Sequence, residues 1–271
     1  MTSATATTVR DSRDTVRQVV VAVSAVLAVI GAFIGSGAAG GTPIQDASGG
    51  ALAADATLIA PGTPAFSIWS IIYLGLLVYA VWQFLPAQRA APRQRRLGYP
   101  VAASLLLNAA WILSIQFDRL WLSVPIILAL LAVLCAAFVL ALRTRPDGWI
   151  DALVTDGTIG LYLGWVCVAT AANITAALVA AGWDGWGVDA ELWAVIVLAV
   201  AGLVGIALAV YGRGRISPAL SLGWGLAWVA VARLTSEPSS TAAGVTAAVA
   251  AAAVLVVTVV LRLSVGRRRP A

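Results

Sequence analysis

The sequence predicts an all-α protein, a polytopic transmembrane bundle of about eight helices. The chain is 61% hydrophobic and 11% charged, with a mean hydropathy of +0.95, which is not the composition of a soluble 271-residue domain. Apolar runs of about 20 residues recur along its length, and backbone amides in lipid require helices. Runs such as 126–142 and 247–257 are apolar on every face, which excludes the alternating strands of a β-barrel.

The membrane spans are predicted, in chain order, at 18–37, 65–85, 99–116, 120–142, 152–179, 191–211, 216–234 and 242–262. The first run also resembles a secretory signal, because arginines precede it and small residues from Ser36 to Ala39 follow it. Its length and the helix-packing pair Gly31 and Gly35 favour a retained helix. Cleavage would leave seven helices with the same orientation.

Loop charges predict the orientation of these spans. All 17 cationic residues are arginines, and all except Arg119 and Arg233 lie before the first span, after the second, fourth and sixth, or at the carboxyl end. The positive-inside rule therefore places both termini in the cytoplasm, in a multi-pass protein of the cell's inner membrane. Arginines dispersed in this way indicate contact with the lipid bilayer and not with nucleic acid.

Aromatic and amide side chains form stripes on three of the spans. Helical spacing places Trp69 and Tyr73 one turn apart in span 65–85, and it aligns rings with an asparagine in each of 99–116 and 152–179. The predicted ligand-binding residues are Trp69, Tyr73, Asn108, Trp111, Trp165, Ala169 and Asn173. Rings of this kind stack on flat, largely apolar ligands, and amides orient them. The alternative is that the amides join helices by hydrogen bonds and the rings fill space.

The same segments resemble a known protein family. Three motifs carry the resemblance: Phe66-Ser67-Ile68-Trp69-Ser70-Ile71-Ile72-Tyr73, Leu107-Asn108-Ala109-Ala110-Trp111, and Tyr162-Leu163-Gly164-Trp165 continuing to Asn173. Their order and spacing resemble the tryptophan-rich sensory protein (TspO/MBR) family, which includes the translocator protein. The resemblance implies a five-helix bundle that binds porphyrins and related hydrophobic ligands in an aromatic cavity closed by the first loop, often as a homodimer. It also implies that Trp69, Asn108 and Trp165 are pocket residues, with Ala169 beside them.

The predicted organisation has four parts: a cytoplasmic tail (1–17), a TspO-like five-helix bundle (18–180), a three-helix transmembrane extension (181–262) and a basic cytoplasmic tail (263–271). The extension lies outside the five-helix core that the resemblance covers. In the first loop, near 38–64, the family's Pro-x-Trp-x-Pro-Pro stretch is represented only by Ala60-Pro61-Gly62-Thr63-Pro64, without its tryptophan. The Gly, Ala, Thr and Pro content of this loop favours an unstructured connection over a lid.

These observations predict a membrane protein that binds porphyrin-like or other hydrophobic small molecules as a sensor or carrier. No cofactor is required, and porphyrin or haem would be a ligand. A secondary transporter unrelated to tetrapyrroles is one alternative, but its only clearly intramembrane acid, Asp156, also suits the amino end of a helix. A porphyrin-modifying enzyme is the other, although a chain without histidine lacks the usual acid–base residue and haem ligand. We predict no catalytic residues and no metal ligands, and we interpret Cys135 and Cys167 as small apolar residues.

Overall fold

The computed structural model describes residues 12–267, and in this range the chain forms helices joined by turns. The long helices are α1 (Ser12–Gly35), α2 (Ile68–Trp82), α4 (Pro92–Gln116), α5 (Leu120–Arg143), α7 (Thr158–Ala180), α8 (Ala190–Tyr211), α9 (Ile216–Thr235) and α10 (Thr241–Arg267). The short segments are η1 (Ala47–Gly50), η2 (Thr63–Ser67), α3 (Pro86–Arg89), α6 (Gly148–Asp151), the π-helical η3 (Ala152–Gly157) and η4 (Gly185–Gly187). The predicted all-α bundle is confirmed, and each predicted span coincides with one long helix.

Among the described residues, seven helical stretches are long and apolar enough to cross a membrane. Of the eight long helices, α9 is the one that does not meet both conditions, although we predicted it as a span like the others. Serine, glycine and tryptophan residues and Arg233 lower its apolar content. Since α9 packs against α7, α8 and α10, protein covers much of its surface and it needs less lipid-facing apolar area.

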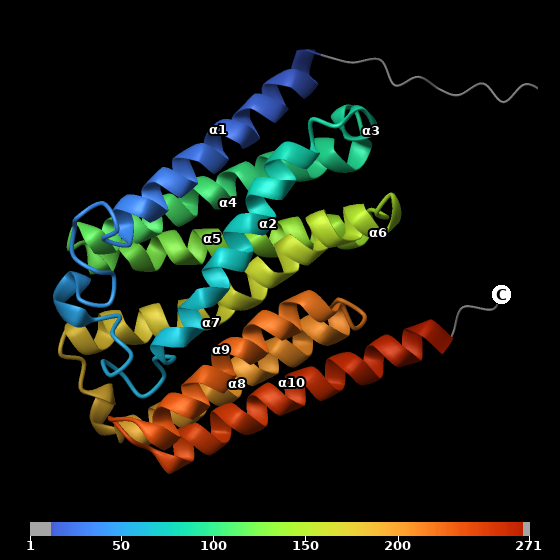
Figure 1. Ribbon diagram of the computed structural model, residues 1–271. Coiled ribbons are helices and arrows are strands. Elements are labelled where there is room, and N and C mark those ends of the chain that lie inside the picture. Colours follow the sequence, from blue (N-terminus) through green and yellow to red (C-terminus); the bar gives the residue numbers. More distant parts are fainter. Residues whose placement is uncertain (1–11, 268–271) are drawn as a thin grey trace, which may run out of the picture.

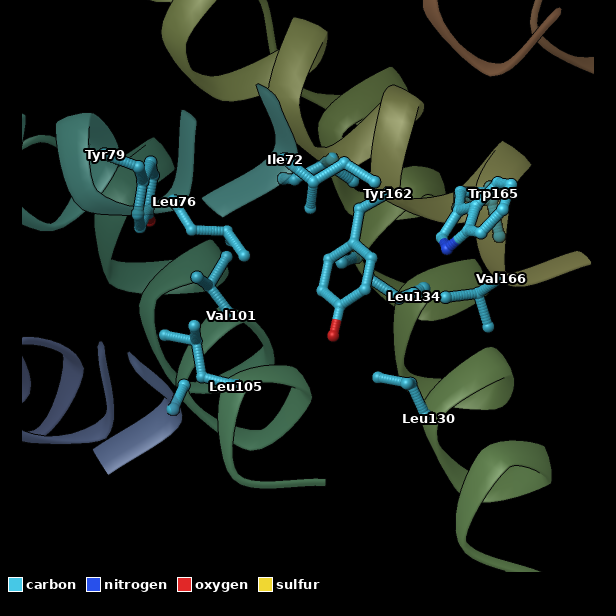
Figure 2. Packing of buried hydrophobic residues seen from close by; sticks show 14 of the residues in the cluster. Ile72, Leu76, Tyr79, Val101, Leu105, Leu130, Leu134, Tyr162, Trp165 and Val166 are labelled. Atoms are coloured by element: carbon cyan, nitrogen blue, oxygen red, sulfur yellow. The ribbon is translucent and has the colours of Figure 1, made fainter. Parts of the chain in front are cut away.

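The helices enclose two hydrophobic cores that meet at α7. The first core draws on α1, α2, α4, α5 and α7, and Figure 2 shows Tyr162 pointing into the space between Leu105 of α4 and Leu134 of α5. The second core draws mainly on α8, α9 and α10, with Val168 of α7 packed among residues such as Leu222. In Figure 1, α8, α9 and α10 accordingly lie together beside α7.

Glycine residues allow close helix contacts at two of these interfaces. A Cβ atom on Gly31 of α1 would lie 2.9 Å from the Cβ of Ala109 in α4, and one on Gly35 would lie 2.8 Å from Ile112 Cγ1. The predicted packing face of α1 is therefore the surface that contacts α4. On α7, Gly164 approaches the backbone of α9 so closely that no side chain would fit.

The two described ends of the chain lie at the same end of the bundle, together with α3 and α6 (Figure 1). We call this the arginine end, and the opposite end, which carries residues 36–67 and the turns 117–119, 181–189 and 236–240, the loop end. The predicted tails, 1–17 and 263–271, lie partly outside the described residues. Within the described range, 12–17 and 263–267 extend α1 and α10. The first turn of α1 is held by α4, because Arg95 Nε donates to Asp14 Oδ1 at 2.8 Å.

The first loop is folded against the loop end, so the prediction of an unstructured connection was wrong. Arg233 of α9 donates from Nη2 to the carbonyl of Ala54 (2.7 Å) and from Nη1 to that of Thr57 (3.2 Å). Trp224 of α9 donates to the carbonyl of Ala65 at 2.9 Å. The donors are 159 to 179 residues from their acceptors in sequence. The composition of the loop therefore could not indicate these hydrogen bonds.

Candidate ligand-binding site

Trp69 of α2 is the centre of an aromatic cluster built by three helices. Its ring centroid lies 6.3 Å from that of Trp111 of α4, with the two rings stacked. The rings of Tyr162 and Trp165 of α7 approach it edge-on at 6.0 and 6.1 Å. Tyr73, one turn along α2, lies 5.6 Å away. The stripes predicted separately on these helices therefore converge on one point, with centroid distances typical of attractive ring contacts.

The two asparagines connect the helices around this cluster. Asn108 Nδ2 donates to Tyr73 Oη at 2.6 Å and so joins α4 to α2. Asn173 Oδ1 accepts from Trp111 Nε1 at 3.1 Å, while its Nδ2 donates to Ser123 Oγ of α5 at 2.9 Å. The amides therefore bridge helices, as the alternative interpretation of the sequence required.

Two buried polar atoms at the cluster have no hydrogen-bond partner among the residues that the structure describes. They are Oδ1 of Asn108 and Nε1 of Trp165, whose side chains are 2% and 1% exposed. An unsatisfied buried polar atom costs about 1–3 kcal/mol. One unpaired acceptor and one unpaired donor beside stacked rings are therefore available to the polar atoms of a bound molecule or to water.

A cavity of about 40 Å³ adjoins the cluster, and we call it the aromatic cavity. Of the predicted site residues, five line it: Trp69, Trp111, Trp165, Ala169 and Asn173. Tyr73 and Asn108 lie outside its lining and join the cluster through the ring contact of Tyr73 with Trp69. The first loop covers one side of the aromatic cavity with residues that include Leu52, Thr57 and Pro61. We call residues 51–61 the lid segment. A volume of this size holds about one water molecule, whereas ligand pockets measure about 300–1,000 Å³.

Three residues of the site were not among those predicted. Phe66 lines the aromatic cavity and contacts Trp165 edge-on at 5.8 Å, and its position three residues before Trp69 could have revealed it. Tyr162 shares the α7 stripe with Trp165, so the same spacing applies to it. Ser123, the partner of Asn173, gave no signal, because α5 carries no stripe.

Asp156, the acid on which the transporter alternative depended, lies at the arginine end and not in the aromatic cavity. It occupies the π-helical segment η3 and forms ion pairs with Arg93 of α4 and Arg215 at the start of α9. Arg93 also pairs with Asp151, Nε to Oδ2 at 3.3 Å. Two guanidinium groups compensate the charge of Asp156, so it links α4, η3 and α9 as part of a buried ionic network.

Comparison with known families adds one finding. A family model described as TSPO-like protein matches residues 21–261. The chain belongs to the TSPO-like protein family. The match begins within α1 and ends within α10, so it includes the three-helix extension of this TSPO-like protein. No curated protein and no solved structure matches it. Family membership and the apolar helices together establish a multi-pass integral membrane protein.

Proposed function

We propose that this TSPO-like protein binds porphyrin-like or other flat hydrophobic molecules in the aromatic cavity. The observation that carries the proposal is the convergence of rings from three helices on Trp69, beside an unpaired buried donor on Trp165 and an unpaired acceptor on Asn108. Ring faces stack on a flat ligand, and the unpaired Nε1 of Trp165, a lining residue, orients its polar groups. Asn108 lies outside the lining of the closed cavity, so its Oδ1 meets the ligand only when the cavity enlarges. The protein then acts as a sensor or carrier in the inner membrane, with both termini in the cytoplasm.

Binding at this site requires the lid segment to move. The aromatic cavity, at about 40 Å³, is far smaller than a tetrapyrrole needs. The lid segment contains no long helix, and the side chain of Arg233 in α9 holds it in place. A ligand therefore shifts the lid from a closed to an open population, which would couple binding to a change at the loop end.

The test is a titration of purified protein in detergent with protoporphyrin IX, followed by tryptophan quenching. We expect saturable quenching in the wild type and at least about tenfold weaker binding after Trp165→Phe with Asn108→Ala, since both orienting groups are lost. Trp121→Phe is the matched control, because Trp121 is 56% exposed near the start of α5. Quenching that does not saturate, or that is the same in all variants, would show that the rings serve packing alone.

Sensing and carrying differ in whether the ligand crosses the membrane. Proteoliposomes loaded with a fluorescent porphyrin separate them: protein-dependent efflux supports a carrier, and binding without efflux supports a sensor. Efflux that survives loss of the aromatic cavity would point to a path outside it.

A further inference from the structure

A second and much larger cavity lies between α7 and α8 at the loop end, and it lies outside the predicted site. Its volume is about 610 Å³, within the range of small-molecule pockets. Ile174 and Leu178 of α7 form one wall, Trp193, Ala194 and Val197 of α8 form the other, and Leu58 of the lid segment closes one end. We call it the α7–α8 cavity.

Packing elsewhere explains why this space stays open. Helix α8 packs closely on α10, where Gly202 approaches Ala250 and Gly205 approaches Val254, and it makes little contact with α7. The turn between α7 and α8 is braced by three tryptophans whose ring centroids lie 5.3 to 5.9 Å apart. Trp193 Nε1 also donates to the carbonyl of Gly185 at 3.0 Å. The braced turn keeps the two helices from closing on the gap.

The α7–α8 cavity is separate from the aromatic cavity. Alternate positions of α7 face the two spaces: Asn173 and Ala176 line the aromatic cavity, whereas Ile174 and Leu178 line the α7–α8 cavity. Of the described residues, Thr57 of the lid segment is the one that borders both cavities. A substitution that alters one cavity can therefore leave the other unchanged.

The charge on the lining indicates the class of ligand. Among the residues that the structure describes, Asp184 is the only charged one that borders the α7–α8 cavity, and it is exposed at the rim. Its Oδ1 accepts a hydrogen bond from the Trp186 amide, and within 12–267 no arginine borders the space to balance its charge. Arg233, which contacts the neighbouring lid segment, is already bonded to backbone carbonyls. The unbalanced carboxylate attracts a cation at the rim and repels an anion.

We propose that the α7–α8 cavity is a binding site for a lipophilic cation, with its apolar body between Leu178 and Val197 and its positive charge facing Asp184. The rings of Trp183 and Trp193, which border the space, add a favourable contact for the cation. This ligand class is opposite in charge to the carboxylate-bearing porphyrins proposed for the aromatic cavity. The proposal does not depend on the porphyrin site.

Equilibrium dialysis with labelled tetraphenylphosphonium tests the proposal, using protein in phosphatidylcholine nanodiscs and empty nanodiscs as background. We expect one saturable site in the wild type. Ala194→Phe should abolish it, because Ala194 is 4% exposed and borders the cavity, so a larger side chain fills the space. Asp184→Asn should weaken binding about tenfold through the lost charge, while it keeps the Oδ1 acceptor for Trp186. Asn108→Ala should leave binding unchanged.

Tetraphenylborate, which has the same shape and the opposite charge, is the matched probe. We expect it to show no saturable component above empty nanodiscs. Equal saturable binding of both probes, or wild-type affinity in Asp184→Asn, would overturn the assignment to cations. Binding that Ala194→Phe leaves intact would overturn the location. Because Asp184 is exposed, Asp184→Asn should fold normally and tests the proposal even if Ala194→Phe does not fold. Loss of tetraphenylphosphonium binding in Asn108→Ala would place the bound cation at the porphyrin site and not in the α7–α8 cavity.

Discussion

Replacement of Arg233 by methionine should loosen the lid segment without unfolding the bundle. Arg233 is 1% exposed, and its guanidinium donates to the carbonyls of Ala54 (2.7 Å) and Thr57 (3.2 Å) in the lid segment. It also donates to the carbonyl of Pro238 at 2.8 Å. Methionine fills most of the same volume but offers no donor, so the variant removes the clamp while it preserves packing.

The size of the effect on the lid follows from the two bonds to Ala54 and Thr57. Hydrogen bonds to a charged group contribute about 1.5–3 kcal/mol each, which gives roughly 3–6 kcal/mol in gross terms. Burial of the guanidinium costs several kcal/mol of desolvation, which offsets much of this sum. We expect lid closure to weaken by about 2–3 kcal/mol, which corresponds to about 30- to 150-fold more of the open form.

Hydrogen exchange measured by mass spectrometry reads this population. The amides of Ala56 and Ala60 donate to carbonyls within the lid segment, at 3.1 and 3.2 Å, and the amide of Ala53 donates to the carbonyl of Gly50 just before it, at 2.9 Å. These three lid amides are therefore the reporters. Their exchange should accelerate by at least about tenfold in Arg233→Met and remain unchanged in α5. Arg119→Met is the control, since Arg119 is the other arginine of the loop end and is exposed. Wild-type exchange in a folded Arg233→Met protein would refute the assignment of Arg233 as a clamp.

Three further predictions concern stability, each checked by thermal unfolding in the same detergent. Trp224→Phe removes the ring donor that α9 offers to the first loop at 2.9 Å and should lower the Tm by about 2–4 °C, whereas a larger loss would mean that ring packing dominates. Gly31→Val should destabilise the bundle by more than about 2 kcal/mol, because even a Cβ there lies 2.9 Å from α4, and Phe33→Val on the exposed face of α1 should not. Asp156→Asn removes the carboxylate that pairs with Arg215 and leaves Arg93 with Asp151 alone, so it should cost about 3–5 kcal/mol. An equal effect of Asp147→Asn, at an exposed position, would contradict the ionic network.

The bundle could be predicted because its determinants are local. Lipid imposes helices on every apolar run of sufficient length, so the spans followed from hydropathy alone. The helix that fell short of the apolar criterion, α9, is the one covered by protein on several sides. Hydropathy measures how a helix meets lipid, and it does not reveal a polar helix that its neighbours shield.

The candidate site could be predicted residue by residue but not in its assembled form. Helical spacing places Trp69 with Tyr73 and Trp165 with Asn173 on single faces; the first pair proved to be partly buried and the second buried. The spacing does not say which faces meet. It therefore gave no sign that Trp69 would be central or that the cavity would be closed to about 40 Å³.

The long-range polar contacts were out of reach of sequence patterns. Arg233 reads as a loop charge and Asp156 as a helix-end carboxylate, because sequence shows only their near neighbours. The lid carbonyls that Arg233 binds are 176 and 179 residues away from it in sequence. Arg93, which pairs with Asp156, is 63 residues away from it. The folding of the first loop could not be predicted for the same reason, because the side chains that bind its carbonyls lie far away in sequence, on α9.

The most direct test of the account is a crystal structure of the protein grown with protoporphyrin IX. We expect porphyrin density against the rings of Trp69 and Trp165, with polar atoms within hydrogen-bond reach of Asn108 Oδ1 and Trp165 Nε1 and with the lid segment displaced. Porphyrin density on the lipid-facing surface only, above an aromatic cavity still closed by the lid segment, would contradict it.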